Sequence, residues 1–222
     1  EKMGYRTRAF HIFDIPSSLA EPLSEKVEEI RNELVKKKEE VLVTFVGSFA
    51  LYQGVDLMFA TIPKVVRQNA YIRFIIIGGT ADEIREKQAM LREQSVDGNV
   101  TFLGKVAPDA LPEYLYASDI LLSPRISGVN THLKILDYMK AGKAIMATDV
   151  PSHRLLLNEA TAVFAKPAPE QLAIALERLA GDEKKRRQMG SAGRNLYETK
   201  YNFGNYRDQL KKCYEYVLLY QE

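Results

Sequence analysis

The sequence predicts an α/β fold: a Rossmann-like, doubly wound parallel sheet of about six strands, with extra helices at the C-terminal end. From residue 41 onward, short and continuously apolar segments alternate with helical stretches, which is typical of parallel strands covered on both faces. After residue 165 only helical patterns remain. With 222 residues and 46% hydrophobic content, the chain is long enough to bury one large core.

The individual elements follow from the apolar spacing and from the residues that interrupt it. Residues 1–22 show no sustained period and contain two prolines, so we expect a connecting segment there. Ser24 is expected to cap a first helix. Residues 23–180 would form the Rossmann-like domain, and residues 181–222 would form helices that pack on it or also on another domain. The expected strands cover residues 41–46, 73–77, 100–103, 119–123, 144–147 and 162–165, and the last helices cover residues 169–180, 182–200 and 205–219.

Charge and composition narrow the classes of function. The chain carries 31 basic and 29 acidic residues, interspersed along its length, so no broad positive field predicts nucleic-acid binding. Cys213 is the single cysteine, which rules out an internal disulfide and is typical of a reducing compartment. No C-x-x-C or H-E-x-x-H motif is present and the three histidines are scattered in the sequence, so we expect no metal site.

The segment between Pro124 and Asp137 predicts an anion site. It lies where an expected strand ends and an expected helix begins, and a helix N-terminus offers unpaired N–H groups and a positive dipole end. Asn130, Lys134 and Asp137 follow at helical spacing, which would place an amide, a cation and a carboxylate on one stripe. The apolar residues of the same helix would face the sheet, on roughly the opposite side. A phosphorylated ligand such as a sugar nucleotide fits this stripe.

Three other loops follow expected strands, and in a doubly wound sheet ligands bind beyond the carboxyl ends of the strands. These loops cover residues 47–54, 78–82 and 104–108, and each contains glycine, which lets backbone amides approach a ligand closely. None has the G-K-[ST] of a Walker loop or the G-x-G-x-x-G dinucleotide fingerprint, so neither ATP nor NAD is predicted.

Several segments, in a specific order and spacing, carry a family resemblance: Val46–Gly47, Gln53–Leu57, Phe74–Gly79, Val100–Val106, Leu111–Asp119, Lys134–Lys143 and Ala147–His153. Residues 41–220 resemble the nucleotide-sugar-binding half of family 4 glycosyltransferases. The resemblance implies a GT-B enzyme of two Rossmann-like domains that retains the anomeric configuration and needs neither metal nor cofactor. This chain would bind the nucleotide sugar, and a missing N-terminal domain would bind the acceptor. We expect a cytoplasmic protein, with peripheral membrane association through that domain.

Two departures from the family pattern concern the donor site. The family carries two glutamates seven residues apart, and these places hold Val129, which has no carboxylate, and Asp137, which would bind the ribose. The family also carries an arginine and a lysine in the first loop, both directed at the diphosphate, and these places hold Ser48 and Gln53.

By the same resemblance, the missing cations would be supplied by the loop that begins at Pro124. Arg125, Asn130 and Lys134 would then stabilise the diphosphate leaving group, where negative charge develops. The donor-binding residues would be Gly47, Ser48 and Gln53 near the diphosphate, Lys105 and Val106 near the base, Thr131 at the sugar and diphosphate, Asp137 at the ribose, and Gly78.

The lost carboxylate and the lost cations leave two alternatives open. One is a non-catalytic relative that keeps the fold as a binding module, and total inactivity on sugar nucleotides with intact partner binding would favour it. The other is a sugar-nucleotide epimerase of the same architecture, which would release nucleotide without forming an acceptor glycoside.

Overall fold

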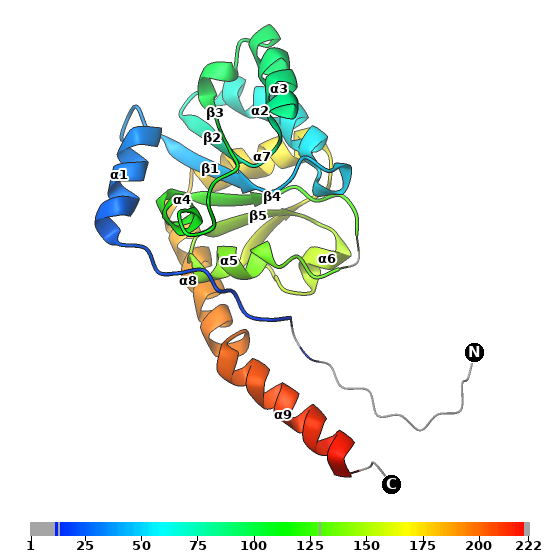
Figure 1. Cartoon of the computed structure of the whole chain (residues 1–222). Coiled ribbons are helices and arrows are strands. Elements are labelled where there is room, and N and C mark those ends of the chain that lie inside the picture. The colour runs from blue at the N-terminus through cyan, green and yellow to red at the C-terminus, as the bar shows by residue number, and fades with distance from the viewer. Residues whose placement is uncertain (1–11, 13, 129, 220–222) are drawn as a thin grey trace, which may run out of the picture.

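The computed structural model describes residues 12, 14–128 and 130–219 of the chain (Figure 1). Its centre is a sheet of six strands, all parallel, in the order β3-β2-β1-β4-β5-β6. The predicted Rossmann-like, doubly wound sheet is confirmed, because the strand order reverses between β1 and β4. The strands are β1 (Val41–Val46), β2 (Ile72–Ile77), β3 (Val100–Gly104), β4 (Ile120–Ser123), β5 (Ala144–Thr148) and β6 (Ala162–Ala165).

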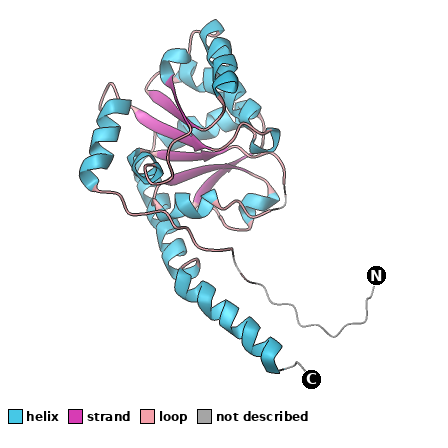
Figure 2. Cartoon of the chain, in the orientation of Figure 1, coloured by secondary structure: helices cyan, strands magenta, loops and turns pink. Residues whose placement is uncertain are grey.

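Helices cover both faces of the sheet, with the strands between them (Figure 2). On one face α2 packs against α7, and on the other α5 packs against α8, while α1 contacts α4. The long helix α9 extends away from this body (Figure 1). The helices are α1 (Ser24–Leu34), α2 (Val55–Gln68), α3 (Ala81–Glu93), α4 (Leu111–Ala117), α5 (Lys134–Lys140), α6 (Pro151–Arg154), α7 (Pro169–Ala180), α8 (Glu183–Lys200) and α9 (Phe203–Leu219), with 3-10 turns η1 (Leu51–Gln53) and η2 (Asp97–Asn99).

The core explains why the strands are continuously apolar. Successive side chains of a strand point to opposite faces, and both faces are buried here. In β1, Val43 and Phe45 belong to a cluster with residues of α2 and α7, while Leu42 packs in another cluster with Ile75 and Ile77 of β2. Each strand position therefore requires an apolar side chain, which is the pattern that predicted the sheet.

Two helix starts differ from the sequence prediction. Ser24 does not cap α1: it is the first helical residue, and the N-cap position is Leu23, which makes no side-chain cap bond. Helix α5 begins at Lys134, so Asn130 and Thr131 precede it and the predicted stripe of Asn130, Lys134 and Asp137 is wrong. The division into a domain at residues 23–180 and helices from residue 181 stays a prediction. Within the part of the chain described, no helix combines the length and apolar character that crossing a membrane requires.

Candidate functional site

The loops that follow β1 and β4 contact each other at the carboxyl edge of the sheet, where the strand order reverses. The backbone N–H of Ile126 donates to the carbonyl of Tyr52 at 3.1 Å. Gly54 has a φ of +71°, and a Cβ there would lie 1.8 Å from the carbonyl oxygen of Pro124. Only glycine satisfies both the backbone conformation and this close approach. The two loops thus form one surface at the switch point, the usual ligand crevice of such folds.

Lys134 brings a cation onto this surface. Its Nζ donates to the carbonyl of Val46 at 2.9 Å and to Oε1 of Gln53 at 3.1 Å, and it lies 4.7 Å from the centre of the Phe45 ring. A Cβ on Gly47 would lie 3.4 Å from the same amine. Gly47, Gln53 and Lys134 are therefore close together, although Lys134 was expected to point away from the sheet.

The environment of this amine disfavours its charged form. Burial lowers the pKa of Lys134 from 10.5 to about 7, and the positive charge of Arg125 adds to the effect. An anion that binds beside a half-buried lysine of this kind stabilises the charged form of its amine. The geometry therefore fits a phosphorylated ligand at the β1 loop.

Arg125 has a different local role, because its side chain is only 6% exposed. Its Nε donates to the carbonyl of Ser127 at 2.6 Å, and its Nη1 contacts the carbonyl of Asn130 at 3.4 Å. Gly128 has a φ of +108°, and a Cβ there would lie 2.0 Å from Nη2. The ring of Tyr52 covers the guanidinium at 5.4 Å. Arg125 thus holds the loop after β4 in place, and its predicted contact with the diphosphate stays a prediction.

Glycines also bring the ends of β1, β2 and β3 together. The N–H of Gly78 donates to the carbonyl of Gly104 at 2.6 Å, and a Cβ on Gly78 would lie 2.0 Å from the carbonyl oxygen of Gly47. Lys105 and Ser48 are exposed at this edge. Val106 instead packs partly buried against the apolar cluster that contains Leu42, Ile75 and Ile77, so a contact with the base would involve its backbone or its remaining exposed edge.

Asn130 and Thr131, the other predicted residues of the β4 loop, have surroundings different from those of Lys134. Asn130 is exposed, and its carbonyl is the part that Arg125 contacts. Thr131 lines a cavity of about 230 Å³ beside Asp14 and Tyr201. Val129, where the family's first glutamate would fall, lies outside the described residues.

Asp137 contacts the segment before α1 rather than the β1 loop. Its Oδ1 accepts a hydrogen bond of 2.5 Å from the hydroxyl of Ser17. Burial raises the pKa of Asp137, while the Ser17 hydrogen bond and the charge of Lys140 lower it. Its predicted contact with a ribose stays a prediction, and Ser17 was not singled out in the sequence because it is 120 positions away.

Two histidines that are distant in sequence meet behind the β4 loop. Nε2 of His153 lies 2.8 Å from Oγ of Ser123, and Nδ1 of His132 lies 3.3 Å from the same oxygen. His153 Nδ1 donates to the carbonyl of Thr148 at 2.7 Å, so its Nε2 accepts from the serine. Burial lowers the pKa of His132 to about 2 and that of His153 to about 4. Both rings are therefore neutral at pH 7 and act as packing groups.

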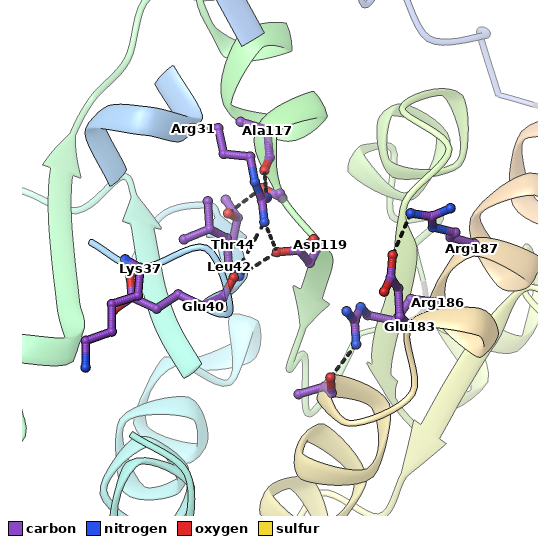
Figure 3. Close-up of polar contacts among 12 residues, drawn as sticks. Arg31, Lys37, Glu40, Leu42, Thr44, Ala117, Asp119, Glu183, Arg186 and Arg187 are labelled. Atoms are coloured by element: carbon purple, nitrogen blue, oxygen red, sulfur yellow. Dashed lines mark hydrogen bonds and ion pairs between the residues drawn. The ribbon is translucent and has the colours of Figure 1, made fainter. Parts of the chain in front are cut away.

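A cavity of about 680 Å³ lies at the opposite edge of the sheet, where β1, β4 and β5 begin. Figure 3 shows the polar contacts of the charged residues beside it. Its charged side chains mostly satisfy one another or the backbone. Arg31 pairs with Asp119 at 3.0 Å, Arg187 pairs with Glu183 at 2.5 Å, and Arg186 donates to the last carbonyls of α7. This cavity therefore lies away from the carboxyl edge of the sheet, where the glycine-containing loops meet. The described residues contain no group of three or more His, Cys, Asp or Glu that could hold a metal ion.

Known proteins match this chain over most of its length. A family model described as "Glycosyl transferases group 1" matches residues 40–182. The phosphatidyl-myo-inositol mannosyltransferase of Mycolicibacterium smegmatis is 25% identical over 185 residues, which cover 81% of this chain and 46% of that protein. The alpha-D-kanosaminyltransferase of Streptomyces kanamyceticus is 25% identical over 79% of this chain and 46% of its own length. The chain thus spans about half the length of these curated relatives.

Solved structures share the fold at lower identity. The C-terminal domain of LpcC, a group 1 family glycosyl transferase of Francisella tularensis, is 17% identical with a TM-score of 0.72, covering 85% of this chain and 99% of that one. HepE of Anabaena, solved in complex with UDP and glucose, is 15% identical with a TM-score of 0.80 over 92% of this chain and 56% of its own.

Proposed function

Because this chain belongs to the group 1 glycosyl transferases, as the match over residues 40–182 establishes, we propose that it is the donor-binding half of a retaining glycosyltransferase. The reaction moves a sugar from a nucleoside-diphosphate sugar to an acceptor glycan, lipid or small molecule, without a metal ion. A further half of the protein binds the acceptor, and the chain's coverage of about half of its relatives supports that division. A cytoplasmic location, with peripheral membrane association through the acceptor half, belongs to the same proposal.

The observation that carries the proposal is the position of the Lys134 amine at the switch point. The amine lies at the side chain of Gln53, which is the place where the family carries a lysine, and beside the backbone of Gly47. A cation from α5 therefore compensates for the one that the first loop has lost. It is positioned to neutralise the charge that develops on the diphosphate as the glycosidic bond breaks.

Backbone groups add to this positive environment. Helix α2 starts at Val55, directly after Gly54, and no side chain caps it. The first N–H groups and the positive dipole end of this 14-residue helix lie next to Gln53, which suits a phosphate group. We assign Gly47, Ser48 and Gln53 to the diphosphate on this basis, with Gly78, Lys105 and Val106 toward the base, Asn130 and Thr131 toward the sugar, Arg125 to the order of the β4 loop, and Asp137 to the ribose.

The proposal is tested by titrating the chain with UDP, GDP and ADP while following its thermal unfolding. A ligand that binds only the folded state adds RT ln(1 + [L]/Kd) to the free energy of unfolding, which is about 2.7 kcal/mol at a hundredfold excess over Kd. We expect one diphosphate to stabilise the chain more than its monophosphate or nucleoside, because Lys134 and the α2 N-terminus contact the terminal phosphates. Equal and negligible shifts for all of these ligands would refute donor binding by this half.

The glycosyl-transfer step needs the full-length protein. With a panel of sugar nucleotides and acceptors, we expect an acceptor glycoside of the same anomeric configuration as the donor. Nucleotide release without any glycoside would point to the epimerase alternative, and complete inactivity to a binding module.

A further inference from the structure

The segment that precedes α1 packs against the core next to the proposed ribose site. Within it Pro16, Ser17 and Leu19 are buried, and Ser17 is only 6% exposed. Leu19 packs in the apolar cluster that also contains residues of α5 and α8. This part of the predicted connecting segment is therefore fixed on the surface of the domain.

Ser17 is held from three sides. The N–H of Leu19 donates to Oγ of Ser17 at 3.0 Å, and the hydroxyl of Tyr197 in α8 donates to the carbonyl of Ser17 at 3.0 Å. Because the serine oxygen already accepts a hydrogen bond, its own proton is directed to Oδ1 of Asp137, at 2.5 Å. The hydroxyl thus has a defined partner and a defined direction.

Asp137 gains two things from this contact. One carboxylate oxygen is fixed in position, and the described residues make no hydrogen bond to the other, Oδ2, which is left to accept from a ligand hydroxyl. The hydrogen bond also favours the ionised carboxylate. The pKa of Asp137 is raised by burial and lowered by Ser17 and by Lys140 on the same helix, and Tyr197 is the titratable group on the α8 side.

We propose that Ser17 is a positioning residue for nucleotide binding, and that its hydroxyl holds Asp137 oriented to accept a hydrogen bond from the donor ribose. The inference rests on the proposed function, because it requires that Asp137 contact the ribose. It also implies that the part of the protein that precedes the Rossmann-like domain contributes to donor affinity without touching the donor.

The test compares Ser17→Ala with Ser18→Ala, which removes the same hydroxyl from the neighbouring, exposed serine. The affinity for UDP, or for GDP if the thermal screen selects it, is measured by calorimetry from pH 5 to pH 8. We expect Ser17→Ala to weaken binding about three- to tenfold at pH 7, as the loss of one ordinary hydrogen bond would, because the serine acts on the donor only through Asp137. Ser18→Ala should bind normally. The fall of affinity in acid should begin at higher pH in Ser17→Ala, because the pKa of Asp137 rises. Ser17→Thr, which keeps the hydroxyl, should restore both properties.

A double-mutant cycle separates positioning from a general loosening of the segment. In an Asp137→Ala background, which removes the acceptor of the Ser17 hydroxyl, Ser17→Ala should have no further effect on affinity or on its pH dependence. Additive losses, or a Ser17→Ala variant with the pH profile of the unmodified chain, would overturn the inference while leaving donor binding intact. Normal affinity in Asp137→Ala itself would instead remove the ribose assignment, and the inference with it. If the unmodified chain binds no nucleoside diphosphate at all, the proposed function itself fails, which is a separate outcome.

Discussion

Substitution of Lys134 by methionine should weaken diphosphate binding and stabilise the free protein. The amine has a pKa of about 7 in the folded chain because burial and Arg125 disfavour its charge. A bound diphosphate favours the charge, so the pKa rises in the complex. A hydrogen bond to a charged group contributes about 1.5–3 kcal/mol, so the variant should bind the diphosphate about 10- to 150-fold more weakly at pH 6.

The same linkage predicts the pH dependence of binding. Below pH 7 the amine is charged in both free and bound protein, and the affinity ratio of the unmodified chain to the variant should be constant. Above pH 7 the free protein must take up a proton to bind, so this ratio should fall by up to about tenfold per pH unit. Taking the ratio cancels the ionisation of the ligand itself.

The effect on stability has the opposite sign. Lowering the pKa from 10.5 to about 7 costs the folded state at most about 5 kcal/mol when the lysine is charged in the unfolded chain, since one pKa unit is about 1.4 kcal/mol. Part of the side chain is exposed and its bonds to Gln53 and Val46 are lost, so Lys134→Met should raise the free energy of unfolding at pH 6 by about 1–3 kcal/mol.

Calorimetric titration and urea unfolding measure these effects, with Lys166→Met as the matched control. Lys166 is an exposed lysine after β6, and its replacement should change neither affinity nor stability by more than about 0.5 kcal/mol. Unchanged affinity in Lys134→Met at pH 6, or an affinity ratio that does not vary between pH 6 and pH 9, would refute the assignment of this amine to the diphosphate.

Three further substitutions test the architecture of the site. Gly54→Ala should destabilise the chain by about 2–4 kcal/mol in urea unfolding, because its Cβ would overlap the Pro124 carbonyl at 1.8 Å; near-normal stability would contradict the close approach of the two loops. Arg125→Met should lower the free energy of unfolding by about 2–4 kcal/mol and speed proteolysis of the β4 loop, since the carbonyls of residues 127 and 130 lose their donor. A loop cleaved no faster than in the unmodified chain would be inconsistent with that role. The pKa of His153 is about 4 in the folded chain and near 6.5 in the unfolded chain. Its contribution of about 3 kcal/mol to the free energy of unfolding is therefore present above pH 6.5 and is lost as the pH falls to 4. In His153→Gln, the free energy of unfolding should depend less on pH between pH 6.5 and pH 4. The same dependence on pH as in the unmodified chain would argue against a buried neutral ring.

The sheet could be predicted because its strands are buried on both faces. In β1, Leu42 and Val43 point to different sides, yet both belong to apolar clusters. Because successive positions are buried, the strand appears in the sequence as a continuous apolar run. The family match and the parallel sheet confirm the predicted fold class and the predicted family.

The start of α5 could not be predicted from spacing. His132, Ile135 and Met139 recur at helical intervals and all are buried, as expected. The loop before them is not helical, because the buried guanidinium of Arg125 binds its backbone carbonyls. A buried arginine that binds backbone carbonyls has no local sequence signature. The same error placed Lys134 on an outward stripe, whereas its long side chain reaches the end of β1.

Contacts between distant segments were also missed. Ser17 and Asp137 are joined by a hydrogen bond, and His132 meets His153, yet neither pair forms a pattern along the chain. The sequence singled out the loops at the strand ends, and the structure brings the loops after β1 and β4 into contact. It did not identify the residues that hold those loops together.

The neighbouring positions of β1 and β4 have a consequence for the order of folding. Val43 pairs with Ile120, although β2 and β3 are formed by the chain between them, so this pairing closes a long loop and is expected late in folding. An intermediate in which only β1, β2 and β3 have assembled would hold Gln53 without Lys134. If the proposed donor site is correct, nucleotide binding requires that the two halves of the sheet have joined, and a nucleotide added during refolding should favour the completed domain.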